Sequence, residues 1–147
     1  MKDKATIIVF SGDFDKVLAA FNIATGAASM GMEVVMFFTF WGLNVIKKDR
    51  PVSRAKGLMR GMLRLFNRGG VKSLPMSRLN LLGMGPWMMR KLMAEFDMPS
   101  LEEMIKLAKE LGVRFIACTT TMGIMGVAKE DLIPEVDDYA TKCMSRG

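Results

Sequence analysis

Two β-rich apolar runs separated by one helix-length segment constrain the fold of this chain more than any other feature. The runs are Ala5–Phe10 (ATIIVF) and Glu33–Phe40 (EVVMFFTF). Between them, Phe14–Met30 carries apolar residues at nearly helical spacing, and Gly31 follows as a helix stop. A strand, a helix and a second strand in this order favour a parallel pair joined by a right-handed crossover. The unbroken apolar run at Ala5–Phe10 predicts a strand covered on both faces.

The last third of the chain repeats this alternation. Ser100 and Glu103 have the spacing of a capping box at the start of a predicted helix, which Gly112 ends. Val113–Cys118 (VRFIAC) is predicted as the third strand, and a short final strand is expected around residues 136–139. We therefore expect one α/β domain over residues 1–147, with a mainly parallel sheet of about five strands.

The middle of the chain is a basic, methionine-rich insertion at about residues 47–96. Between Lys47 and Lys91, twelve lysines and arginines face a single acid, Asp49, which gives this segment a net charge of +11 in a chain of net charge +6. Within it, residues 53–70 predict a helix with an i, i+4 row of arginines, namely Arg60, Arg64 and Arg68.

Three interpretations of this basic insertion stay open. It is a solvated face, an amphipathic element lying on anionic lipid, or a docking surface for an acidic protein. Nucleic acid is not expected as a partner, because aromatic residues are sparse in the insertion and no recognised binding motif is present.

Composition excludes several classes of chemistry. With no histidine among its 147 residues, the chain cannot supply a Ser-His-Asp or Cys-His catalytic set or a histidine zinc site. Its two cysteines, Cys118 and Cys143, form no disulfide framework and have no metal-ligand spacing, so we expect a reducing, cytoplasmic compartment and no metal or cofactor.

The start lacks a signal-peptide pattern. The most apolar window, Glu33–Ile46, is shorter than the ~20 residues that a bilayer-spanning helix needs.

Cys118 is the strongest candidate for chemistry. It ends a predicted buried strand, and ligands and reactive groups of parallel sheets collect at the carboxyl ends of strands. If the following TTTMGIMG segment begins a helix, free N–H groups and the helix dipole stabilise a thiolate, and the hydroxyls of Thr119, Thr120 and Thr121 can donate to it. The alternative is that Cys118 is a small buried apolar residue.

Other residues also have both a functional and a structural interpretation. Ser11, Gly12 and Asp13 follow the first strand as an anion cradle or, more simply, as a capped turn, and Asp13 would oppose a thiolate if it pointed at one. Phe40 and Trp41 follow the second strand and either wall the same cleft or pack in the core. Met122 completes the expected lining of the site. Cys143 is either a relay thiol or an incidental cysteine in the tail.

The two ends of the chain resemble a known family. The stretch ATIIVFSGDFDKVLAAFNIATGAASMGMEVVMFFTFWGL together with RFIACTTTMGIMGV resembles the DsrE/DsrF-like sulfur-relay family, specifically its larger DsrE2-like, peroxiredoxin-labelled branch. The similarity covers about two-thirds of the chain, and the basic insertion is typical of that branch. It implies a three-layer α/β/α fold, a homo-oligomer, and a carrier cysteine that holds sulfur as a persulfide, which Cys118 matches.

Two functions therefore stand as hypotheses. The first is a sulfurtransferase or sulfur carrier that holds sulfane sulfur on Cys118 and passes it from a donor protein to an acceptor protein. The second is a non-catalytic oligomeric module that docks a membrane surface or an acidic protein through the basic insertion.

Overall fold

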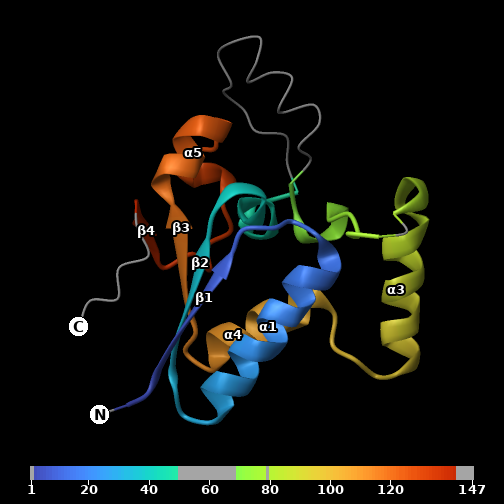
Figure 1. Ribbon diagram of the computed structural model, residues 1–147, viewed down its shortest axis with the longest axis horizontal. Helices are drawn as coiled ribbons and strands as arrows, with labels where there is room; N and C mark the ends of the chain where they lie inside the picture. Colours follow the sequence, from blue (N-terminus) through green and yellow to red (C-terminus); the bar gives the residue numbers. More distant parts are fainter. Residues whose placement is uncertain (1, 50–68, 79, 142–147) are drawn as a thin grey trace.

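A four-stranded parallel sheet forms the centre of the protein (Figure 1). The computed structural model describes residues 2–49, 69–78 and 80–141. Within these residues the strands lie in the order β1-β2-β3-β4. Their bounds are β1 (Lys4–Val9), β2 (Glu33–Phe38), β3 (Arg114–Cys118) and β4 (Asp138–Ala140). Every neighbouring pair is parallel, which confirms the predicted strand type.

Helix α1 (Phe14–Ser29) makes the first crossover and α4 (Leu101–Glu110) makes the second. The predicted capping box of α4 is confirmed: Glu103 N–H donates to Ser100 Oγ at 3.3 Å, and Ser100 N–H donates to the Glu103 carboxylate at 2.7 Å. Each helix runs into a glycine of positive φ, Gly31 (85°) after α1 and Gly112 (81°) after α4, a backbone conformation that favours glycine. The capping box and the two glycines therefore predicted the start of α4 and the ends of both crossover helices.

Both crossover helices cover the same face of the sheet, and they pack side by side (Figure 1). The strand order explains this arrangement, because successive right-handed crossovers that advance in one direction place their helices on one face. The described residues thus show four strands and one covering helix layer, where about five strands and three layers were expected. The prediction that the first strand is covered on both faces was wrong: Ile8 is 55% exposed on the face opposite the helices.

The core lies between the sheet and these two helices. Three phenylalanines from α1, β2 and β3 meet at its centre with ring centroids 5.4–6.4 Å apart, namely Phe21, Phe38 and Phe115. A smaller cluster on the opposite face contains Phe37, Ile116 and Cys118. The thiol therefore belongs to the face that α1 and α4 leave open.

The remaining elements gather around this frame. A 3₁₀ helix, η1 (Phe40–Ile46), follows β2. Two more 3₁₀ helices, η2 (Val71–Ser73) and η3 (Leu81–Gly83), and helix α3 (Met84–Glu95) precede α4. Helix α5 (Thr119–Met125) and the 3₁₀ helix η4 (Lys129–Asp131) follow β3.

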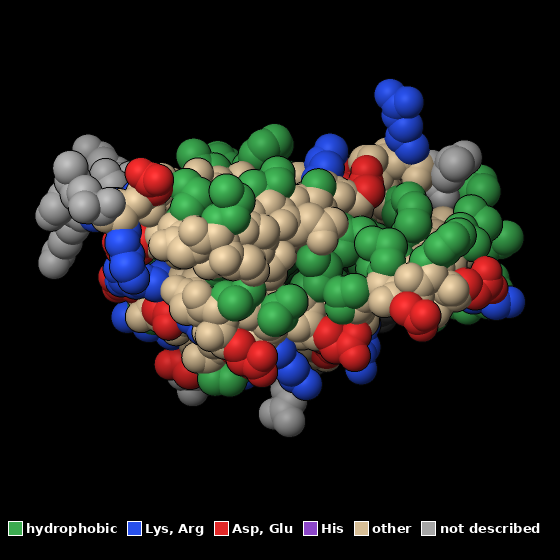
Figure 2. Space-filling model, turned by 90° about the horizontal axis from the view of Figure 1, so that it is seen from below, with side chains coloured by type: hydrophobic (Ala, Val, Ile, Leu, Met, Phe, Trp, Pro, Cys, Tyr) green, Lys and Arg blue, Asp and Glu red, His purple; other side chains and the backbone are tan. Residues whose placement is uncertain are grey.

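Most of the helix predicted over 53–70, with Arg60, Arg64 and Arg68, lies outside the described residues. No described helix is long and apolar enough to cross a bilayer. Hydrophobic side chains gather on the surface at the end that carries α3 (Figure 2).

Candidate functional site

The carboxyl ends of β1, β2 and β3 meet at one edge of the sheet because the strands are parallel and adjacent. Cys118 is the last residue of β3, pairs in register with Ala140 of β4, and lies directly before α5. The pairing of Phe38 with Ala117 brings Thr39, the residue after β2, alongside Cys118. The register of the strands therefore sets which residues surround the thiol.

The environment of Cys118 favours a thiolate. The residue is only 5% exposed, and this burial raises the pKa of the thiol. Hydrogen bonds outweigh that effect: the hydroxyl and backbone N–H of Thr121, the hydroxyl of Thr39 and the backbone N–H of Thr120 together hold the pKa of Cys118 below its usual value. Since the thiolate is the nucleophilic form, the lowered pKa makes this thiol a better nucleophile at a given pH than the same thiol without these hydrogen bonds.

Thr39 and Thr121 form one hydroxyl pair beside the sulfur. Their Oγ1 atoms are 2.9 Å apart, and Phe40 N–H donates to Thr121 Oγ1 at 3.3 Å. Each hydroxyl has one proton, so when one of the two donates to the other, the proton of the accepting hydroxyl is left to be donated to Cys118. The loop after β2 thus holds in place the hydroxyls that surround Cys118.

The three predicted threonines have different positions. Thr121 is 3% exposed and reaches Cys118 through both its hydroxyl and its backbone, whereas Thr120 takes part through its backbone N–H. Thr119 is not among the residues whose hydrogen bonds lower the pKa of Cys118. Met122 is buried in the main core cluster and not in the small cluster that contains the thiol.

Thr39 is the site residue that sequence reasoning missed. Its signal was present: a polar residue in the last part of a β-rich apolar run, next to the predicted Phe40 and Trp41. Its importance depends on the lateral register of β2 against β3, which a single sequence does not give.

The loop after β1 packs against the loop after β2. A Cβ on Gly12 would lie 2.8 Å from the carbonyl oxygen of Trp41, and one on Gly42 would lie 1.9 Å from that of Val9. Only glycine allows these backbones to approach so closely. The two loops therefore form one unit at the edge where Cys118 lies.

Ser11 and Asp13 are engaged within their own turn. Asp13 N–H donates to Ser11 Oγ at 3.1 Å, and the Asp13 carboxylate binds Lys16 Nζ at 2.7 Å. Asp13 holds the N-cap position of α1 without a side-chain cap, and Phe14 N–H donates to Pro75 O at 2.7 Å. These contacts match a tight turn better than an anion cradle, but no side chain caps α1, and Lys16 balances the charge of Asp13.

Phe40 and Trp41 lie at the same edge with much of their surface in solvent. They are 60% and 49% exposed, so the core-packing alternative does not hold. Phe40 also has a positive φ of 47°, a left-handed conformation that is rare for a bulky residue. Local strain of this kind clusters at functional sites.

Other candidate chemistry is sparse in the part of the chain that the structure describes. No group of three or more histidine, cysteine, aspartate or glutamate side chains is placed to hold a metal ion there. Cys143, the second cysteine, lies outside the described residues.

Comparison with known proteins identifies relatives over nearly the whole chain. Residues 1–144 match the sequence model of the DsrE/DsrF/DrsH-like family. The chain is 37% identical over 134 residues to the uncharacterized protein YrkE of Bacillus subtilis, covering 91% of this chain and 84% of that protein. It is 32% identical over 140 residues to the sulfur carrier protein DsrE2 of Allochromatium vinosum, covering 91% and 85% respectively.

Proposed function

We propose that this chain, which belongs to the DsrE/DsrF/DrsH-like family, carries sulfane sulfur as a persulfide on Cys118 and passes it to an acceptor thiol. One observation carries the proposal: the Cys118 thiol ends a parallel strand, where threonine hydroxyls and backbone amides lower its pKa. The name of the Allochromatium relative, sulfur carrier protein DsrE2, supports the proposal.

The proposed reaction needs no external oxidant or reductant. The Cys118 thiolate attacks the outer sulfur of a donor persulfide, R–S–SH; a new S–S bond forms, the donor S–S bond breaks, and the donor leaves as the thiolate R–S⁻. Cys118 then holds Cys–S–SH. An acceptor thiolate attacks the terminal sulfur, takes it as its own persulfide, and returns Cys118 to the thiolate.

The residues around Cys118 have distinct roles in this scheme. Hydrogen bonds from Thr39 and Thr121 and from the amides of Thr120 and Thr121 stabilise the thiolate before attack and again when it leaves. The 5% exposure of Cys118 leaves a narrow approach. An added sulfur lengthens the side chain by the ~2 Å of an S–S bond, which helps the carried atom to reach an acceptor.

Mass spectrometry of the intact chain after exposure to inorganic polysulfide tests the loading step. We expect the native chain to gain one sulfur atom, which dithiothreitol removes, and Cys118→Ser to gain none. Cys143→Ser is the matched control, because it removes the other thiol and is expected to load as the native chain does. Equal loading of the native chain and Cys118→Ser would exclude Cys118 as the carrier.

A second candidate function rests on the surface of α3. Met84, Met88 and Leu92 follow one another at i, i+4 spacing and are 66%, 50% and 41% exposed, and the neighbouring Trp87 is 63% exposed. Such a stripe, in a part of the sequence that is strongly basic, suits a binding module that docks an anionic membrane or an acidic protein, or that joins copies of the chain in a homo-oligomer. Under this alternative, Cys118 would react as an ordinary thiol, and association would weaken with added salt.

A further inference from the structure

The two segments that frame the Cys118 thiol contain no charged side chain. Residues 39–46 follow β2, and residues 115–128 include most of β3 and all of α5; neither segment has a lysine, arginine, aspartate or glutamate, in a chain that is 24% charged. A hydrogen bond joins them, because Phe40 N–H donates to Thr121 Oγ1 at 3.3 Å, and η1 and α5 lie at the same end of the sheet (Figure 1). They therefore form one uncharged surface at the thiol.

Four large apolar side chains are exposed at this edge of the sheet. Phe10, Phe40, Trp41 and Ile124 are 62%, 60%, 49% and 60% exposed, whereas Cys118 is 5% exposed. Phe10 follows β1, Phe40 and Trp41 begin η1, and Ile124 belongs to α5. We call these four residues the apolar rim. Exposed apolar side chains that gather at one place mark interaction surfaces.

The backbone holds the rim in place. Phe40 has its positive φ of 47°, and a Cβ on Gly12 would lie 2.8 Å from the Trp41 carbonyl oxygen, so the start of η1 is packed against the loop after β1. Ile124 follows Thr121 by three residues on α5, a spacing that makes the two neighbours on a helix. The rim therefore approaches the thiol from the β2 side and from α5, and little ordering is needed when a partner binds.

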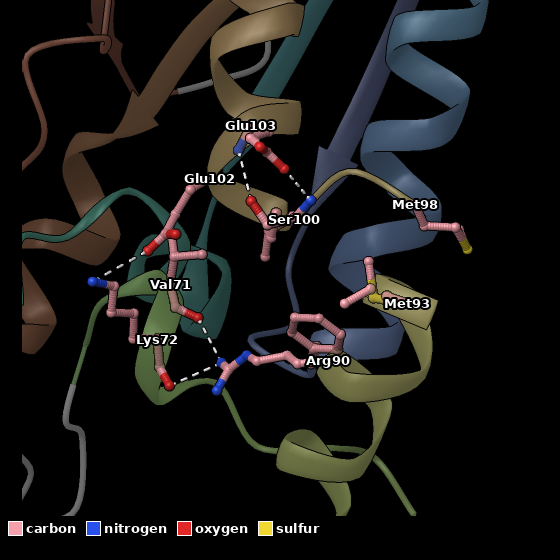
Figure 3. Close-up of a pocket in the computed structure, with 11 residues that line it drawn as sticks. Val71, Lys72, Arg90, Met93, Met98, Ser100, Glu102 and Glu103 are labelled. Carbon is pink, nitrogen blue, oxygen red and sulfur yellow. Dashed lines mark hydrogen bonds and ion pairs between the residues drawn. The ribbon is translucent and has the colours of Figure 1, made fainter. Parts of the chain in front are cut away.

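Charged groups gather elsewhere, in a cavity of about 420 Å³ (Figure 3). Its lining includes side chains of both signs, namely Lys72, Arg90, Glu102 and Glu103. A charged small molecule finds counter-charges there, whereas against the rim it would lose water without gaining a partner. In the loop after β1, Asp13 and Lys16 pair with each other at 2.7 Å. The surface at Cys118 therefore favours an uncharged, apolar contact.

We propose that the apolar rim receives the sulfur acceptor, and that this acceptor is a polypeptide whose cysteine has apolar neighbours. The inference rests on the persulfide transfer proposed above and adds the class of acceptor. Because the rim approaches the 5%-exposed thiol from two sides, an acceptor reaches the sulfur while it buries apolar groups on both sides of its own thiol. A cysteine between two apolar residues has this arrangement, and a small anionic thiol such as glutathione does not.

The transfer step keeps its balance. The acceptor thiolate attacks the terminal sulfur of the Cys118 persulfide and forms a new S–S bond, while the S–S bond to Cys118 breaks and Cys118 leaves as the thiolate. Packing against Phe40, Trp41 and Ile124 holds the acceptor sulfur beside the carried one. The rim residues thus select the acceptor and take no part in bond making.

A comparison of synthetic acceptors tests the inference on the full-length chain. The chain is loaded with inorganic polysulfide, freed of excess reagent and mixed separately with acetyl-Leu-Cys-Leu-amide, acetyl-Ser-Cys-Ser-amide or glutathione, and mass spectrometry follows the transfer. We expect the leucine peptide to accept sulfur about tenfold faster than the serine peptide at equal concentrations below saturation. Glutathione should be no faster than the serine peptide. Since both peptides are uncharged, added salt should leave their ratio unchanged.

Trp41→Ser and Ile124→Ser should each bring the ratio of the two peptide rates towards one, because each removes apolar area from the rim at an exposed position. Ile23→Ser is the matched control. Ile23 is 63% exposed on α1, which covers the opposite face of the sheet, so this variant should keep the native ratio.

A native chain that loads sulfur but passes it equally fast to the two peptides would overturn the inference and leave the carrier function intact. The inference also fails if glutathione is the fastest acceptor, or if both rim variants keep the native ratio. A native chain that does not load would contradict the carrier function itself, and the inference about its acceptor with it.

Discussion

At the scale of single residues, the chemistry of Cys118 depends on its neighbours Thr39 and Thr121. Burial alone would raise the pKa of this thiol, and the lowered value exists because hydroxyls and amides donate to the sulfur. A depressed pKa means that the reactive thiolate persists to lower pH than in an ordinary cysteine. The rate of alkylation should therefore rise with pH around a midpoint below the usual range of a free thiol.

Removing one hydroxyl should move that midpoint upward. Thr121→Val keeps the shape of the side chain but removes a donor to the sulfur, so we expect its pH profile of iodoacetamide alkylation to shift to higher pH and its rate at neutral pH to fall roughly tenfold. Thr39→Val should shift the profile in the same direction. Thr120→Val is the control, because Thr120 acts through its backbone. A profile unchanged in Thr121→Val would contradict the proposed hydrogen bond.

Phe40 offers a second test at this scale. Its φ of 47° carries a cost of ~1–2 kcal/mol for a residue other than glycine, while its ring is 60% exposed and packs little. We expect Phe40→Gly to leave the free energy of unfolding within ~1 kcal/mol of the native value. Two residues earlier, Phe38 is fully buried, and Phe38→Ala should cost ~3–5 kcal/mol. Urea denaturation of both variants makes the comparison, and a large loss in Phe40→Gly would mean that the ring is packed.

Residue-scale prediction from sequence succeeded where the signal is local. Cys118 could be placed at a strand end because the apolar run before it and the polar run after it are both visible in the sequence. Thr39 could not, because its contact with Thr121 joins residues 82 positions apart. The left-handed backbone of Phe40 has no local signature, since sequence patterns favour glycine or asparagine at such positions.

At the scale of elements, the ends of the helices were more predictable than the coverage of the strands. Capping depends on residues three positions apart, so the start of α4 followed directly from Ser100 and Glu103. Coverage of a strand depends on the order of all strands in the sheet, which the apolar runs in the sequence do not specify. The expectation that the first strand is covered on both faces failed for that reason.

The capping box gives a direct stability test. Ser100→Ala removes one acceptor at the start of α4, and we expect it to lower the free energy of unfolding by ~1 kcal/mol in urea denaturation. Lys106→Ala, at an exposed position within the same helix, should change it by less than ~0.5 kcal/mol. Equal effects of the two substitutions would show that the box contributes no net stability.

At the scale of the whole molecule, the basic insertion and the folded body can be tested separately. Asp49 and Gly70 lie in contact: a Cβ on Gly70 would be 3.2 Å from the Asp49 Cα. The described residues on the two sides of 50–68 therefore already lie close together, which favours an excision of residues 50–68. The excision removes six positive charges, Arg50, Arg54, Lys56, Arg60, Arg64 and Arg68, and no acid, so the net charge falls from +6 to 0.

We expect the chain without residues 50–68 to stay folded and to load sulfur on Cys118 as the native chain does, because none of the residues that bind the thiol is removed. Its association with vesicles containing anionic lipid, if the native chain shows any, should be weaker at low salt. Thermal unfolding, intact-mass loading and vesicle co-sedimentation measure the three properties. A wider deletion reaching Lys91 would be a poorer test, since it removes Leu74 from the core and Arg90 from its place over Phe14.

The most direct test of the central claim follows one sulfur atom through Cys118. The chain is loaded with polysulfide, freed of excess reagent and mixed with one equivalent of a small thiol, and both species are weighed over time. The account predicts that the chain loses the mass of one sulfur as the thiol gains it as a persulfide, and that Cys118→Ser gives neither change. A chain that loads but keeps its sulfur, or a thiol that gains sulfur equally with Cys118→Ser, would contradict transfer through Cys118.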